Sequence, residues 1–193
     1  MTVSDARAAG RTAYLWLRPM AVTASLLLLG YGVLRLVDGL DGHRDKSAWP
    51  WMTGHTLFLL GIVAFGATIV GLHGLVGSVS SRLRAVDDVA AVAGLVGAAA
   101  FIYVILGDLF PRFADAAPPP ALVLAGGPAL FQLGILVLLF RAAALRLLPV
   151  WGAVLVLVGF VAIAVNLDLL PVGAALVFSG LFRLGKPAVR AGR

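Results

Sequence analysis

The residues of this chain that could do chemistry are polar side chains at the ends of its apolar segments. Six of them fall on one predicted side of the molecule: Asp38, His55, Asp108, Gln132, Asn166 and Asp168. Ionisable groups at membrane depth are costly and often mark a site or a pathway. If the six converge, Asp108 and Asp168 are the candidate catalytic residues, as general acids, and the other four are candidate substrate-binding residues. The alternative, which we favour, is that each residue only ends a helix at the membrane surface, where polar side chains collect.

Other catalytic and metal-binding patterns are missing from the sequence. There is no cysteine, which excludes disulfides and thiolate ligands, and no phosphate-binding glycine loop occurs. His55 and His73 lie five helical turns, about 27 Å, apart on one predicted helix, so they cannot share one haem or metal ion. Asp87-Asp88 lacks the second acidic motif of a magnesium site, and we assign it to a helix start, where negative charge offsets the helix dipole. We expect no metal site and no cofactor.

The composition predicts an integral membrane protein. Hydrophobic residues make up 61% of the 193-residue chain, charged residues only 12%, and the mean hydropathy is +1.03. Soluble domains contain about 25% charged residues, and a water-soluble fold of this size could not hide so much apolar surface. The net charge of +6 comes from bases between the apolar runs, so it indicates membrane topology and not binding to nucleic acid.

Six apolar runs predict an all-α helical bundle that forms one transmembrane domain over residues 1–193, because about 20 apolar residues cross a bilayer as one helix. We place the runs at residues 14–37, 53–76, 84–110, 121–145, 149–165 and 169–184. The start of the fourth run is open between residues 121 and 128. Residues 117–120, Ala-Pro-Pro-Pro, must form a loop, and Gly126-Gly127-Pro128 is a second break signal.

The last apolar stretch, residues 148–184, is too long for one crossing, since a single helix of that length would measure about 55 Å. Asn166-Leu167-Asp168 interrupts the stretch and Pro171 follows, so we divide it here into two short spans. The alternative is one span followed by a surface helix. Glycine is frequent in the chain, with 23 residues, which predicts close packing between the helices.

The basic residues favour a cytoplasmic location for both termini. With six spans, only four of the fifteen basic residues fall on the side opposite the termini: Arg35, Arg44, Lys46 and Arg112. Basic residues accumulate on the cytoplasmic side of membrane proteins. A five-span chain would leave the basic C-terminus outside. We therefore predict six spans in the plasma membrane, with the six polar residues at the outer face.

The second span carries His55-Thr-Leu-Phe-Leu-Leu-Gly61 and Gly71-Leu72-His73. A proline-containing outer loop follows the third span, and Leu148-Pro149-Val150-Trp151 and Leu170-Pro171-Val172-Gly173 introduce the last two. Over about residues 53–184 this pattern resembles small, uncharacterised multi-pass membrane proteins of high-GC Gram-positive bacteria. The resemblance implies six spans and a cell-membrane location, and it implies no activity.

Three functions are open to such a chain. The first, which we expect, is an accessory component of the cell membrane that contacts membrane lipids and a second copy or another membrane protein. The second is a membrane-embedded enzyme of the terpene-cyclase type, which acts on a lipid or isoprenoid through the outer carboxyl groups. The third is a small solute or cation carrier, which would need polar groups near the membrane midplane. Only a few such groups lie there: Thr23, Ser25, Thr68 and Ser179.

Overall fold

The chain folds into helices, in a computed structural model that describes residues 3–40, 42–43, 45–182 and 184. No strand occurs among these residues, so the predicted all-α class is confirmed. In chain order the helices are α1 (Val3–Asp38), α2 (Trp49–Val79), α3 (Arg84–Leu109), α4 (Pro111–Ala116), α5 (Ala121–Ala144), α6 (Val150–Val165), the 3₁₀ helix η1 (Leu167–Leu169) and α7 (Leu170–Leu181).

Four helices of the described chain are long and apolar enough to cross a membrane. They are α2, α3, α5 and the part of α1 from Leu15 to Asp38. Their lengths of 24 to 31 residues correspond to about 36 to 46 Å, whereas the hydrocarbon core of a bilayer is about 30 Å thick. Helices α6 and α7 are also apolar, but they contain only 16 and 12 residues.

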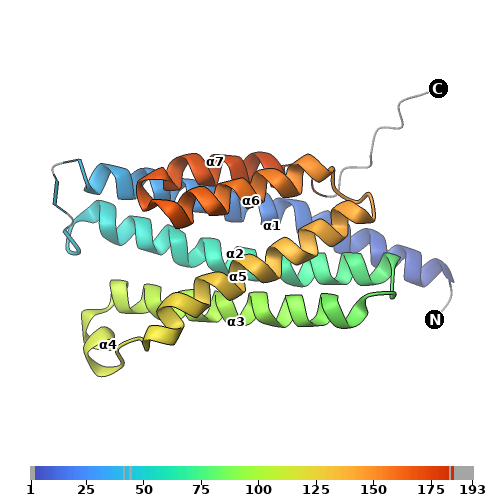
Figure 1. The fold of residues 1–193 in the computed structure, drawn as a ribbon, viewed down its shortest axis with the longest axis horizontal. Coiled ribbons are helices and arrows are strands. Elements are labelled where there is room, and N and C mark those ends of the chain that lie inside the picture. The colour runs from blue at the N-terminus through green and yellow to red at the C-terminus, as the bar shows by residue number, and fades with distance from the viewer. Residues whose placement is uncertain (1–2, 41, 44, 183, 185–193) are drawn as a thin grey trace.

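Six helices, all except α4 and η1, lie side by side along one axis, and we call them the six long helices. They form three antiparallel pairs (Figure 1): α1 with α2, α3 with α5, and α6 with α7. The pairs are joined where α2 packs on α3 and α5, α1 on α7, and α5 on α6. Connections alternate between two ends of the bundle. The α4 end carries residues 39–40, 42–43 and 45–48, together with α4 and η1, and the Arg82 end carries residues 80–83 and 145–149.

Helix α5 begins at Ala121, so the segment Gly126-Gly127-Pro128 continues the helix. Proline removes one backbone donor from a helix, a loss that surrounding helices can compensate in a membrane protein. Gly127 instead serves packing, because a Cβ there would lie 2.5 Å from the Cβ of Ala100 on α3. The segment Gly126-Gly127-Pro128, which the sequence marks as a possible helix break, is therefore a site of close approach between α3 and α5.

The last apolar stretch contains the two antiparallel helices α6 and α7, so it is divided at Asn166–Asp168 as the sequence predicts. Gly152 faces Gly180 and Gly159 faces Gly173 across the pair. A Cβ at Gly180 would lie 2.5 Å from the carbonyl oxygen of Gly152, and a Cβ at Gly159 would lie 2.5 Å from that of Gly173. Small residues at such spacing let the backbones touch, which brings dispersion contacts in place of a hydrophobic driving force.

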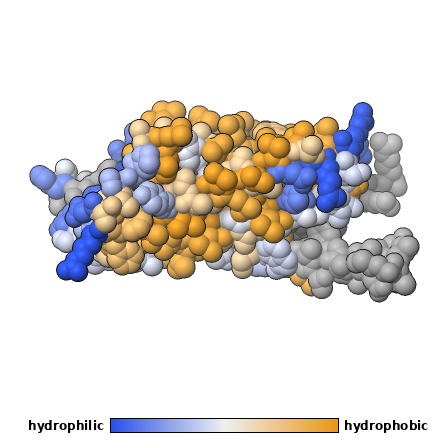
Figure 2. Space-filling model, turned by 90° about the horizontal axis from the view of Figure 1, so that it is seen from below, coloured by the Kyte–Doolittle hydropathy of each residue, from blue (hydrophilic) through white to orange (hydrophobic). Residues whose placement is uncertain are grey.

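Apolar side chains cover the middle of the face seen in Figure 2, and hydrophilic residues gather towards its two ends. Large apolar side chains are exposed on all six long helices, among them Leu26, Val63, Val92, Leu133, Val158 and Val172. Soluble monomers rarely expose continuous apolar areas of more than a few hundred Å². The bundle thus has the surface of a protein whose middle is solvated by hydrocarbon.

Candidate ligand cavity

The structure brings together two of the predicted site residues, Asp108 and His55. Asp108 lies in the last turn of α3, and its Oδ2 is 3.7 Å from Nε2 of His55 on α2. The His55 ring is buried: it stacks on Trp51 with a centroid distance of 4.1 Å and meets Tyr31 edge-on at 5.2 Å. Its Nδ1 lies 2.9 Å from the carbonyl oxygen of Trp51. Since a carbonyl only accepts, Nδ1 is assigned the hydrogen, and Nε2 is left facing the carboxylate.

Lys46, in the loop before α2, contacts two members of this group of residues, Asp108 and Trp51. Its Nζ lies 3.1 Å from Oδ1 of Asp108 and 5.4 Å from the centroid of the Trp51 ring. The Trp51 indole N–H donates to the carbonyl oxygen of Asp108 at 3.4 Å. Next to Lys46, the Ser47 hydroxyl and backbone N–H donate to Asp45 and lower the pKa of that carboxyl. Asp45 and Ser47 are therefore hydrogen-bonded to each other on either side of Lys46, which brings its ammonium to Asp108.

A cavity of about 520 Å³ opens beside Asp108 and extends inward to Phe65 in the middle of α2. All six long helices line it, and its walls are mostly apolar. Six aromatic rings contribute to the walls: Tyr31, Phe58, Phe65, Phe101, Phe131 and Phe160. Only a few polar side chains join them: Tyr31, Arg35, Asp108 and Gln132. Mostly apolar walls with a few placed polar groups, at this volume, are typical of pockets for small ligands.

Arg35 is the residue of this site that the sequence did not single out. It lines the cavity and also a neighbouring hollow of about 400 Å³ at the α4 end. Its Nε is buried and has no hydrogen-bond partner among the described residues. A signal was available, because Arg35 lies inside the first predicted span, residues 14–37, where a charge is itself unusual.

The remaining predicted site residues are placed outside the cavity, with Gln132 the exception. Asp38 is buried one turn after Arg35 on α1, and its Oδ2 has no partner in the described structure. Asn166 is exposed, and its side-chain oxygen accepts from the backbone N–H of Asp168 at 2.8 Å, which starts η1. Asp168 lines the smaller hollow. The two candidate catalytic carboxyls therefore line different spaces.

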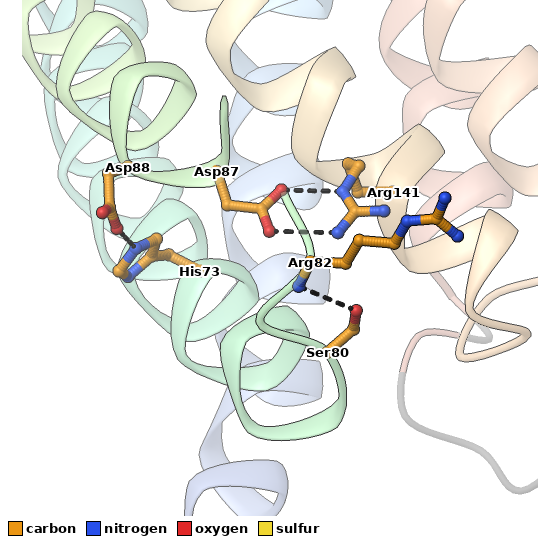
Figure 3. A network of polar contacts seen from close by, with 6 residues as sticks. All are labelled: His73, Ser80, Arg82, Asp87, Asp88 and Arg141. Atoms are coloured by element: carbon orange, nitrogen blue, oxygen red, sulfur yellow. Dashed lines mark hydrogen bonds and ion pairs between the residues drawn. The ribbon is translucent and has the colours of Figure 1, made fainter. Parts of the chain in front are cut away.

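A second polar network lies at the Arg82 end (Figure 3). Arg141 on α5 donates to both carboxylate oxygens of Asp87 on α3, from Nε at 2.9 Å and from Nη2 at 3.2 Å. Asp87 is 1% exposed. Nε2 of His73 lies 2.6 Å from Oδ1 of Asp88. Asp87 does lie in the first turn of α3 as expected, but its main role is a helix-to-helix ion pair.

Among the described residues there is no cluster of three or more histidine, cysteine, aspartate or glutamate side chains that could hold a metal ion. Comparisons of the chain with protein-family models, with curated proteins and with solved structures gave no match. The resemblance drawn from the sequence stays a prediction, and the site has to be interpreted from its own geometry.

Proposed function

We propose that this chain is a multi-pass protein of the cell membrane whose six long helices all cross the bilayer, with both termini in the cytoplasm. The exposed apolar side chains and the four long apolar helices support membrane insertion. The exposed bases Arg82, just before α3, and Arg84, its first residue, lie at the Arg82 end, which supports a cytoplasmic position for that end. The α6–α7 pair is about 24 Å long or less, and a bilayer adapts to such a short pair by local thinning.

The function that the geometry supports best is non-enzymatic: the protein holds one lipid-like molecule in the cavity at its outer end. The observation that carries this proposal is the cavity itself, with about 520 Å³ of space and mostly apolar walls, inside a bundle whose helices touch closely at several glycines. An apolar space of this size is costly when it is empty, because its lining loses contacts. An alkyl or isoprenoid chain would restore those contacts.

Native mass spectrometry of the full chain in detergent tests this proposal, with mono-oleoylglycerol as the probe. We expect one molecule retained per protein chain. Replacing Ala125, which lines the cavity, in the variant Ala125→Phe should abolish retention. The control Ala129→Phe carries the same change one turn along α5, at an exposed residue outside the lining, and should retain the lipid. Equal retention by all three proteins would contradict a lipid site in the cavity.

The second candidate is an enzyme that acts on an isoprenoid chain. The specific observation in its favour is that Asp108 is the one carboxyl among the described residues that line the cavity, next to aromatic rings whose faces stabilise cations. Asp108 would then be the general acid in its protonated form, which requires the ion pair with Lys46 to break. Incubation with an isoprenoid diphosphate or alcohol and mass analysis of the extract tests this candidate. A product that Asp108→Asn fails to form supports it, and unchanged substrate with the native chain contradicts it.

The carrier function finds little support in the geometry. The hydroxyls of Ser25, Thr68 and Ser179 each donate to a carbonyl oxygen of the preceding turn of their own helix, at 2.8 to 2.9 Å. Hydroxyls engaged in this way satisfy their own helix and do not form a polar path between helices.

A further inference from the structure

The cavity contains a charged group that the protein itself does not neutralise. Arg35 lines the cavity, and no ion pair joins it to a carboxylate anywhere in the described chain. Its buried Nε likewise has no hydrogen-bond acceptor there. A buried guanidinium N–H without an acceptor is strongly unfavourable, since such groups are otherwise paired or hydrogen-bonded. The Nε hydrogen is therefore available to an acceptor from outside the protein.

Two of the three carboxylates nearby, Asp108 and Asp168, have other partners, and the third, Asp38, lies outside the cavity lining. Asp108 accepts from Lys46 at 3.1 Å, so its charge is already offset. Asp168 takes part in an interaction of its own. Asp38 lies one turn along the same helix and does not line the cavity. Among the described lining residues, Arg35 is therefore left as the charge that no ion pair offsets, because Asp108 is paired with Lys46.

The position of Arg35 also sets where a ligand would place its head. Arg35 lines both the apolar cavity and the smaller hollow at the α4 end. An acceptor bound to its guanidinium would lie at the junction of the two spaces, with the aromatic cavity extending inward from that point. This geometry fits an amphiphile with a single chain, whose head is at the membrane surface and whose tail is between the helices.

We infer that the ligand is a single-chain lipid with a negatively charged phosphate head, and that Arg35 binds the head. This inference rests on the proposed lipid-binding function and adds to it the class of the ligand. The planar fork of arginine matches phosphate oxygens with two parallel hydrogen bonds. The phosphate supplies the acceptor that Arg35 lacks, and the chain fills the cavity.

Two probes that differ only in the phosphate test the inference: mono-oleoylglycerol and 1-oleoylglycerol 3-phosphate. With the full chain in detergent, native mass spectrometry should give at least about tenfold tighter binding of the phosphate form, the effect of one charge-assisted contact. Arg35→Gln should remove this preference and leave binding of the neutral lipid unchanged. Arg35→Lys, which keeps the charge but loses the fork, should keep only part of it.

Arg112→Gln is the matched control, because it removes one charge from an exposed residue of α4 at the same end, outside the cavity lining. It should leave the preference intact. Inorganic phosphate in excess should not displace the lipid phosphate, because it has no chain to occupy the cavity; displacement would show a free-anion site and overturn the inference. Equal binding of the two lipids would overturn the inference and leave the proposed function standing. Binding of neither lipid would overturn both.

Discussion

Arg141 and Asp87 join α5 to α3 by two parallel hydrogen bonds, of 2.9 Å and 3.2 Å, with the carboxylate 1% exposed. The pair lies where α3 begins and α5 ends, at the Arg82 end of the bundle. Further along the same two helices, Gly134 and Gly94 meet backbone to backbone. One polar contact and one glycine contact thus hold this pair of helices together on the side of the cavity away from the α4 end.

Removing one member of this ion pair should destabilise the protein strongly. Arg141→Met leaves the buried Asp87 carboxylate without a partner, and we expect a loss of about 3–5 kcal/mol in the free energy of unfolding. Thermal unfolding in detergent measures the effect. The double variant Asp87→Leu with Arg141→Met should recover most of the loss, because no charge is left buried. Arg82→Met, at an exposed residue nearby, serves as the control and should change little. A single variant as stable as the native chain would show that the pair contributes nothing.

The glycine contact between α3 and α5 makes a second prediction. In Gly134→Ala the new Cβ would overlap the backbone of Gly94, so the helices must separate, at a cost of about 1–3 kcal/mol or more. Gly74→Ala on α2 is the matched control, because no atom lies within 4 Å of the added Cβ. It should be neutral or stabilising by up to about 1 kcal/mol, the difference in helix propensity. Equal stability of the two variants would contradict the close approach.

At the α4 end, we expect His55 to matter more for stability than Asp108. His55→Ala removes a ring that is 4% exposed and packed between Trp51 and Tyr31, and should cost about 2–4 kcal/mol by analogy with other large-to-small core changes. Asp108→Asn breaks an ion pair whose lysine side chain is 67% exposed, which is worth at most about 1 kcal/mol. Urea or thermal unfolding in the same detergent measures the loss of stability in each of the two variants. The reverse order would mean that Asp108 holds the end together.

Much of the fold follows from the sequence, because hydrophobic runs of the right length must be helical in lipid and prolines and polar triplets separate them. Asn166-Leu167-Asp168 does divide the last apolar stretch, and its cap is the Asn166 side chain itself. The sequence could not decide whether α5 starts at residue 121 or at residue 128. Gly126-Gly127-Pro128 has the composition of a turn, and only the proximity of Ala100 on another helix explains why the helix continues there.

The site was predictable in part. Asp108 and His55 could be matched because both stand at ends of neighbouring helices on one side, and they do approach each other. The cavity could not be predicted, because it depends on which helix faces meet across long sequence separations, as when Phe58, Phe131 and Phe160 line one cavity. The pairing of Asp87 with Arg141 was missed for the same reason, although opposite charges at adjacent ends of α3 and α5 suggest it.

Cysteine labelling in intact cells tests the central claim, six membrane crossings with the cavity end outside, most directly. The chain has no cysteine of its own, so single substitutions report cleanly. A membrane-impermeant maleimide should label Ser47→Cys, before α2, and Leu169→Cys, in the turn between α6 and α7. It should label Ser81→Cys, between α2 and α3, only after the cells are permeabilised. Labelling of Ser81→Cys in intact cells, or of Leu169→Cys only after permeabilisation, would contradict the account.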